Sequence, residues 1–284
     1  MELVKLSKRL LTVANMVTKG SVVADIGTDH GYLPIYLVQN NISEHVIAMD
    51  VNKGPLSKAL LNITQLNLED KIDIRLSDGL DNLKNNEANT VTICGMGGKL
   101  IAKILESGRS KISPNDELIL SPQSEIQQFR KYLLQNDYSI VKEDMVLEDG
   151  KFYTIIKCTL KDECRKSDSN ESKTDKSKND VSKIDESETD EFKTNESEKV
   201  KSIKKESITK NSDTVQSNAY LKYGKYLLEH KNDILKEYLL KEQKSYLRIR
   251  ENVDSCDSEL AEGRINEIDY ELSCIEEGLK YYEM

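Results

Sequence analysis

The chain has 284 residues, a length that predicts one sizeable core with an accessory piece. The formal net charge of -9 argues against broad, nonspecific binding of nucleic acid, although it is compatible with a local basic patch. The 5 cysteines form no C-x-x-C pair, which indicates neither a zinc site nor a disulfide framework and favours a reducing cytoplasm. No apolar run approaches membrane-spanning length and the N-terminus lacks the apolar core of a signal peptide, so we expect a soluble, unexported protein.

Composition divides the chain into three parts. Residues 1–160 carry 18 basic and 20 acidic side chains, as an ordinary globular domain does. In residues 161–217, 28 of 57 side chains are charged and few are apolar, which predicts a disordered linker. Residues 218–284 return to periodic Leu, Ile and Tyr, and we expect them to form a second, helical module.

The N-terminal segment predicts an amphipathic helix over residues 2–17, because apolar residues recur there at spacings of three and four. Strands and helices then alternate, which predicts βαβ units and a largely parallel sheet covered on both faces. Two final strands are joined by Glu148-Asp149-Gly150, a hairpin turn signal. The predicted strands are 22–26, 46–49, 72–76, 91–94, 118–120, 139–147 and 151–160, and the later predicted helices begin after Gly31 and span 55–66, 99–107 and 126–135.

A parallel α/β sheet closed by an antiparallel pair is the Rossmann-like shape of class I methyltransferases, but a fold does not fix a function. The turn after the first strand is more informative. A dinucleotide-binding G-x-G-x-x-G turn approaches a pyrophosphate, whereas here carboxylates flank the turn at Asp25 and Asp29. Such a turn suits a ligand with a positive end, such as the ammonium and sulfonium of S-adenosylmethionine. NAD or another nucleotide is the second interpretation.

Three further strand ends carry polar or glycine signals. Asp50 can accept hydrogen bonds from two ribose hydroxyls, Asp78 can accept one from adenine, and small residues at 95–98 would let a flat ligand approach the backbone. An aspartate after a strand is more often a turn or N-cap residue, so the coincidence of these signals carries the interpretation. The expected cofactor contacts are Asp25, Gly27, Thr28, Gly31, Asp50, Val51, Asp78, Gly79, Gly95 and Met96.

Four segments are distinctive in combination: L-S-K-R-L at 6–10, T-D-H-G-Y-L-P at 28–34, Gly79-Leu80, and G-M-G-G at 95–98. At these segments the sequence resembles the bacterial tRNA adenine-22 N1-methyltransferase family, over residues 1–160 and again over about 219–284. The resemblance implies a Rossmann-like catalytic domain, a C-terminal pair of antiparallel helices, and methylation of N1 of an adenine in the D-arm region of tRNA. Residues 161–217 are an insertion that the family pattern does not need, and Lys225 stands where that pattern leads us to expect Pro.

The acceptor chemistry gives roles to the turn residues. Methyl transfer is an in-line displacement that needs alignment and exclusion of water, with no metal and no covalent nucleophile. Adenine N1 must be unpaired or flipped into the pocket, and the methylated purine carries positive charge. Our hypothesis is that Asp29 stabilises that charge as it develops and that His30 shapes the pocket, although His30 fits a packing role equally well. We expect substrate contacts at Lys8, Arg9, Tyr32, Pro34, Gly97, Gly98, Gln123, Lys225 and Arg248.

The C-terminal module predicts a helical hairpin. An earlier helix is expected over about 220–253, a polar break over 254–258, and a heptad seam follows. Residues 220–250 hold 8 basic and 4 acidic side chains, whereas residues 251–284 hold 2 and 11. Contacts with tRNA phosphates and simple interhelical ion pairs explain this asymmetry about equally. The seam residues are Ile265, Ile268, Leu272, Ile275, Leu279 and Tyr282.

Two other functions stay open from the sequence. One is a methyltransferase that acts on a protein or a small molecule, and the other is a non-catalytic RNA-binding protein with the same fold. An N/D-P-P-Y/F segment is missing after the fourth strand, which argues against the commonest exocyclic-amino methyltransferases. We expect a cytoplasmic monomer that binds tRNA and holds no metal.

Overall fold

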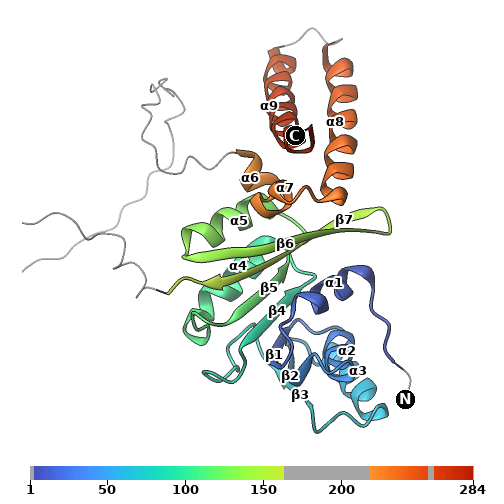
Figure 1. The fold of residues 1–284 in the computed structure, drawn as a ribbon, viewed down its shortest axis with the longest axis vertical. Helices are drawn as coiled ribbons and strands as arrows, with labels where there is room; N and C mark the ends of the chain where they lie inside the picture. The colour runs from blue at the N-terminus through green and yellow to red at the C-terminus, as the bar shows by residue number, and fades with distance from the viewer. Residues whose placement is uncertain (1–2, 163–217, 255–258, 284) are drawn as a thin grey trace, which may run out of the picture. The chain divides into compact units, whose positions relative to one another are not determined.

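The sheet of the protein is largely parallel and ends in an antiparallel pair, as the sequence predicts. The computed structural model describes residues 3–162, 218–254 and 259–283. Within them, seven strands form one sheet in the order β3-β2-β1-β4-β5-β7-β6, in which β7 runs antiparallel to β5 and β6 antiparallel to β7 (Figure 1). The strands are β1 Ser21–Ile26, β2 Ser43–Asp50, β3 Ile72–Leu76, β4 Thr90–Cys94, β5 Glu117–Ser121, β6 Tyr138–Glu148 and β7 Lys151–Leu160.

Helices cover both faces of this sheet. Val13 of α1, Leu37 of α2 and Ile63 of α3 belong to one buried cluster, whereas Ile101 of α4 and Phe129 of α5 belong to another. The two clusters lie on opposite sides of the sheet because side chains alternate between its faces along each strand. These helices are α1 Lys8–Met16, α2 Tyr32–Gln39, α3 Lys53–Gln65, α4 Gly98–Ser107 and α5 Ile126–Gln135, with a 3-10 turn, η1, at Arg109–Lys111.

The first helix is shorter than the predicted 2–17, and the prediction is wrong for residues 3–7. Ser7 is the N-cap, because its hydroxyl accepts a hydrogen bond from the Leu10 amide. The residues before it are not helical, and the Val4 amide donates instead to Gln39 Oε1 at 2.9 Å. A tertiary contact therefore replaces the helical hydrogen bond that the apolar spacing suggested.

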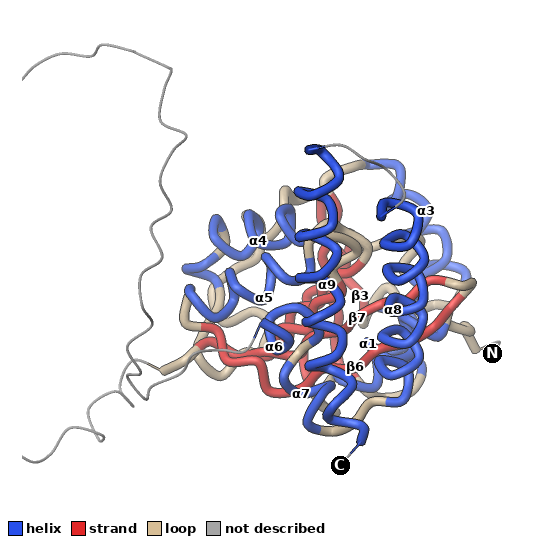
Figure 2. Tube along the Cα trace, turned by 90° about the horizontal axis from the view of Figure 1, so that it is seen from above, coloured by secondary structure: helices blue, strands red, loops and turns tan. Residues whose placement is uncertain are grey.

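The C-terminal module contains more breaks than predicted. In place of one helix over 220–253 there are α6 Asn218–Tyr223, α7 Lys225–Glu229 and α8 Asp233–Asp254. Gly224 separates the first two with a φ of +94°, which favours glycine. The last helix, α9 Glu259–Glu283, runs back beside α8 (Figures 1 and 2).

The predicted seam is largely buried: Ile268 and Ile275 are 1% and 0% exposed. The polar break at 254–258 lies outside the described residues except for Asp254, and the predicted linker 161–217 lies outside them except for its first two residues. None of the described helices is long and apolar enough to cross a membrane.

Arg130 of α5 joins the C-terminal helices to the sheet. Its Nε donates to Glu143 Oε1 of β6 at 2.7 Å, and both side chains are buried. The other guanidinium nitrogens donate to the carbonyls of Leu221, Lys222 and Tyr223, at the end of α6, at 2.7 to 3.3 Å. These carbonyls lack helical partners because the helix ends there. One side chain thus satisfies a buried carboxylate and a helix terminus together.

We expect Arg130→Met to destabilise the protein by about 3–5 kcal/mol, because it leaves the Glu143 charge buried and uncompensated. Hydrogen exchange should become faster in α6 through α9 before it does in β1 and β4. The control is Arg109→Met, since the Arg109 guanidinium donates to only one carbonyl, that of Asn136, and lies over the Tyr138 ring. Its expected cost is about 1 kcal/mol. Equal losses of unfolding free energy in the two variants would contradict this account.

Candidate functional site

The carboxyl ends of β1 and β4 lie side by side, because the two strands pair in parallel at the centre of the sheet. The helices that follow them cover opposite faces, and in open α/β sheets ligands bind in the crevice at such an edge. The carboxyl ends of β1, β2, β3 and β4 and the turns after them carry all ten residues that the sequence predicts as cofactor contacts. The fold therefore brings the four separate sequence signals to one edge.

The turn after β1 is fixed by a single carbonyl. The amides of Gly27 and Thr28 donate to the Met49 carbonyl at 2.8 and 3.0 Å, which ties this turn to the end of β2. Gly27 has a φ of +76°, and a Cβ atom there would collide with the Met96 methyl group. Glycine is favoured here because this left-handed backbone conformation strains any residue with a Cβ.

Asp25 is a buried carboxyl at the end of β1, 5% exposed. Burial raises its pKa above the usual range, and the nearby Asp50 carboxylate raises it further, whereas the Thr92 hydroxyl, which donates to Asp25 Oδ1 at 2.7 Å, opposes the shift. A positively charged neighbour would favour the ionised form of this carboxyl. The electrostatics of the crevice therefore favour a cationic group beside Asp25 and disfavour a pyrophosphate.

Arg9 brings a positive charge to the same edge. Burial and Asp25 together raise the pKa of the Cys94 thiol to about 12, while Arg9 acts in the opposite direction. The thiol thus stays protonated at neutral pH and is a poor nucleophile. The Arg9 guanidinium lies 5.4 Å from the centre of the Tyr153 ring. Arg9 Nη1 is one of several buried polar atoms in the described part of the chain that have no hydrogen-bond partner, which leaves it available to a ligand. The Thr28 hydroxyl, by contrast, helps to lower the pKa of Asp25 by hydrogen bonding.

Asp29 and His30 stand at the mouth of the crevice. The Asp29 side chain is 81% exposed, and its Oδ1 lies 3.4 Å from His30 Nε2. His30 has a φ of +56°, its ring stacks on Tyr32 with 5.4 Å between centroids, and its carbonyl accepts a hydrogen bond from Asn62 Nδ2 at 2.8 Å. These contacts hold His30 in place while the Asp29 carboxylate is left accessible.

A family model described as a methyltransferase domain matches residues 6–156. The chain belongs to this methyltransferase family. The match covers the sheet and the crevice just described, and it confirms the class I fold that the sequence predicts.

Individual relatives of this methyltransferase narrow the resemblance. A Bacillus subtilis tRNA (adenine(22)-N(1))-methyltransferase is 42% identical over 152 residues, which are 54% of this chain and 64% of that protein, so the match spans less than two thirds of that relative. The crystal structure of the B. subtilis M1A22 tRNA methyltransferase TrmK is 28% identical with a TM-score of 0.70, covering 97% of this chain and 99% of that one. A putative tRNA (m1A22) methyltransferase of Streptococcus pneumoniae, in complex with S-adenosyl-L-methionine, is 25% identical with a TM-score of 0.70 and coverage of 97% and 100%. The family resemblance inferred from the sequence is thereby confirmed.

The predicted substrate residues of the methyltransferase are more scattered than the cofactor residues. Tyr32 is at the crevice, whereas Pro34 is buried inside α2. Gly97 and Gly98 make room for Ser124, because Cβ atoms on them would lie 2.8 Å from its hydroxyl and carbonyl oxygens, which is a packing reason for both glycines.

The other predicted substrate contacts lie in different parts of the fold. The backbone amide of Gln123 donates to the Met96 carbonyl at 2.9 Å, so Gln123 is held beside the turn after β4. Lys8 is exposed at the start of α1, next to Arg9. Lys225 and Arg248 belong to α7 and α8, which pack on β6 at the far edge of the sheet from β1. The described contacts therefore do not bring these two cations to the crevice.

Three residues of the site were missed in the sequence. Thr92 reads as an ordinary strand residue, but it is fully buried against Asp25. Asn62 lies in the middle of α3 and holds the His30 carbonyl, and Tyr153 lies on the antiparallel strand β7 beside Arg9. Thr92 and Tyr153 alternate with core residues as in any packed strand, Asn62 is an ordinary helix residue, and no local motif marks the three.

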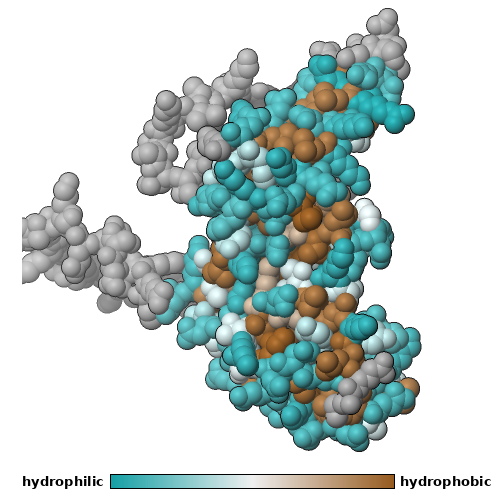
Figure 3. Space-filling model, turned by 45° about the vertical axis from the view of Figure 1, so that its right-hand side comes forward, coloured by the Kyte–Doolittle hydropathy of each residue, from teal (hydrophilic) through white to brown (hydrophobic). Residues whose placement is uncertain are grey.

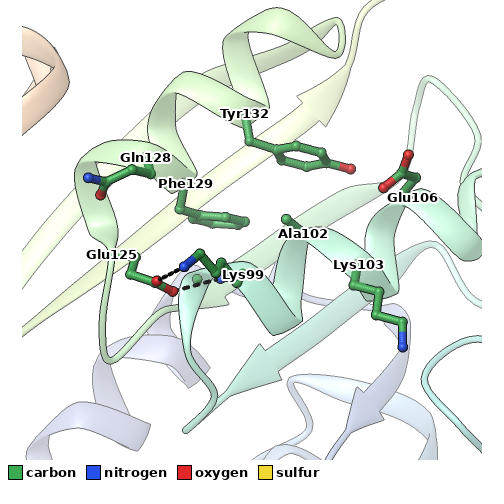
Figure 4. Close-up of a pocket in the computed structure, with 9 residues that line it drawn as sticks. Lys99, Ala102, Lys103, Glu106, Glu125, Gln128, Phe129 and Tyr132 are labelled. Atoms are coloured by element: carbon green, nitrogen blue, oxygen red, sulfur yellow. Dashed lines mark hydrogen bonds and ion pairs between the residues drawn. The ribbon is translucent and has the colours of Figure 1, made fainter. Parts of the chain in front are cut away.

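A second depression lies between α4 and α5, away from these residues. It encloses about 280 Å³, and the rings of Phe129 and Tyr132 form part of its lining (Figure 4). Lys99 forms an ion pair with Glu125 at 2.7 Å across one end. The described residues contain no group of three or more His, Cys, Asp or Glu side chains that could hold a metal ion.

Proposed function

We propose that this methyltransferase transfers the methyl group of S-adenosylmethionine to N1 of adenine 22 in tRNA. The observation that carries the proposal is the similarity to the B. subtilis TrmK structure over 97% of the chain, which includes the C-terminal helices as well as the catalytic sheet. The acceptor, the whole protein's activity and its partner rest on this similarity together with the chemistry of the crevice.

The residues of the crevice fit the cofactor. Its methionine end carries an ammonium and a carboxylate. The crevice offers the buried Asp25 carboxyl, which has no cationic partner among the causes of its pKa shift, and the Arg9 guanidinium, whose Nη1 has no hydrogen-bond partner. We assign the ammonium to Asp25 and the carboxylate to Arg9, which was expected from the sequence to contact substrate. The remaining contacts are proposed as the ribose at Asp50 and Val51, adenine at Asp78 and Gly79, and close backbone approach at Gly27, Thr28, Gly31, Gly95 and Met96.

The acceptor base meets the outer part of the crevice. The sulfonium of the cofactor supplies an already activated methyl group, so the protein has to align adenine N1 and exclude water. The extruded base enters at the outer part of the crevice, where the exposed Tyr32 side chain lies. Positive charge develops on the purine as N1 becomes methylated, and the accessible Asp29 carboxylate stabilises it. Lys8, Gln123, Lys225 and Arg248 are proposed as tRNA contacts, the last two with phosphates at a distance from the reaction.

The setting of the reaction is proposed to be the cytoplasm, with the protein acting as a monomer and without a metal. The thiol of Cys94 takes no covalent part, since its raised pKa keeps it protonated.

Incubation with labelled S-adenosylmethionine and unmodified tRNA, followed by digestion to nucleosides, tests the activity. We expect label in 1-methyladenosine, and none when adenine 22 is replaced by guanosine in the transcript. Label in another nucleoside, in protein or in a small molecule would overturn the assigned acceptor. Absence of any transfer by folded protein would favour a non-catalytic RNA-binding role.

Asp29→Asn should lower kcat by roughly tenfold or more, because it removes the charge that stabilises the developing cation. The dissociation constant of the cofactor should change little. The matched control is Asp78→Asn, which we expect to weaken cofactor binding with a smaller effect on saturated kcat. Unchanged turnover in Asp29→Asn would remove Asp29 from the mechanism.

Arg9→Met keeps the apolar stem against Tyr153 but removes the guanidinium. We expect cofactor affinity, measured by calorimetry, to fall by roughly tenfold or more, as for the loss of a hydrogen bond to a charged group. Lys8→Met, at the exposed neighbouring cation, should leave that affinity unchanged. If Arg9→Met instead raises only the KM for tRNA, the guanidinium binds an RNA phosphate and the assignment to the cofactor is wrong.

A further inference from the structure

A pocket of about 480 Å³ lies outside the crevice, between the N-terminal segment, α2 and α3. Its size is typical of pockets that hold small ligands. Of the residues assigned above to cofactor and acceptor, its lining contains only Tyr32. It is therefore a separate cavity that meets the active site at one aromatic side chain.

One wall of this pocket is formed by the non-helical residues that precede α1. Leu3, Val4 and Lys5 line one side, and the hydrogen bond from the Val4 amide to Gln39 holds this segment along α2. In the lower part of Figure 3, apolar surface is interspersed with polar surface. Leu3 is 61% exposed and Tyr32 is 43% exposed, so apolar surface is left accessible beside the crevice.

Tyr32 links the pocket to the reacting groups. Its ring is parallel to that of His30 to within 2°. The His30 carbonyl is bound in turn by Asn62, whose side chain also lines the pocket. A ligand in the pocket would therefore touch the same two side chains that position His30 and, next to it, Asp29.

We propose that this pocket binds an unpaired nucleotide of the RNA that neighbours the target adenine. The inference rests on the proposed tRNA substrate and adds a second nucleotide site to it. The Tyr32 ring offers a face for stacking, the exposed Gln65 amide offers a donor and an acceptor for a base edge, and the exposed Lys5 offers a charge for a phosphate. The target base itself must enter the crevice, because the methyl donor is placed by residues that the pocket does not contain.

The depression between α4 and α5 is the other cavity with a lysine and a glutamine, and its charges favour RNA less. Lys99 and Lys103 in its lining are matched by Glu106 and Glu125 (Figure 4). Among the described residues, Lys5 is the only charged one that lines the pocket beside Tyr32, and it gives this lining a positive charge. A phosphodiester is accordingly attracted to the pocket beside Tyr32 and not to the cavity between α4 and α5.

A matched pair of double variants tests the inference. Lys5→Ala/Gln65→Ala alters the proposed pocket, and Lys103→Ala/Gln128→Ala makes the same two changes in the cavity between α4 and α5. All four side chains are exposed, so the fold should tolerate both variants, which thermal unfolding checks. Methyl transfer is measured on tRNA transcripts that carry an abasic site at each nucleotide flanking adenine 22, and RNA affinity is measured by fluorescence anisotropy.

We expect one abasic position to lower kcat/KM of the unaltered protein by roughly tenfold, as for the loss of one stacked base. Lys5→Ala/Gln65→Ala should raise the KM for intact tRNA by a similar factor, with kcat and cofactor affinity unchanged. In that variant the same abasic site should cost much less, whereas the control variant should respond as the unaltered protein does.

The nucleotide site would be overturned if the abasic site and Lys5→Ala/Gln65→Ala lowered kcat/KM independently of each other at every flanking position. It would also be overturned if the abasic site had no effect in the control variant Lys103→Ala/Gln128→Ala. Efficient methylation of intact tRNA together with either result would leave the proposed function standing. No methyl transfer to intact tRNA by the unaltered protein would refute the proposed function, and this inference with it.

Discussion

The parallel pairing of β1 with both β2 and β4 is the constraint on which the rest of the molecule depends. Because the chain leaves β1 toward β2 and later crosses to β4, the helices after these strands cover opposite faces of the sheet. The turns at the carboxyl ends cannot close over each other, and a crevice results. Hydrogen bonds to the Met49 carbonyl tie the turn after β1 to the end of β2, and the Met96 side chain lies against Gly27.

Charges of both signs then decide what such a crevice can hold. A dinucleotide site needs backbone amides aimed at an anion, whereas here the amides of Gly27 and Thr28 are already used by a carbonyl. Asp25 on one strand and Arg9 on the first helix supply opposite charges instead. In the proposed function a zwitterionic amino-acid group meets both charges, and the more exposed Asp29 serves the acceptor side. The different proposed roles of these two aspartates follow from burial, because Asp25 is buried whereas Asp29 is exposed.

Strands and strand-end signals were predictable from the sequence because each depends on a short, regular pattern. Tertiary contacts overrode such patterns elsewhere. The spacing of Leu3 and Leu6 fits a helix, yet the bond from Val4 to Gln39 holds the segment extended. Gly224 interrupts a long helical pattern because the Glu143 carboxylate occupies the space a Cβ would need. The positions of Thr92 and Tyr153 in the site were beyond prediction, since their contacts with Asp25 and Arg9 join segments distant in sequence.

The contacts of Arg130 also bear on how this chain accommodates the long segment between β7 and α6. They fix α6 against α5 and β6 directly, so the placement of the C-terminal helices does not rely on a short connection from β7. The entropic cost of closing a chain connection rises only logarithmically, by about 0.6 kcal/mol for each doubling of its length. Breaking the buried contacts of Arg130 would cost several times that amount, so the length of the connection between β7 and α6 weighs little against them. The sheet and the helical hairpin are thereby held together by contacts in space, whatever the length of the segment that joins them.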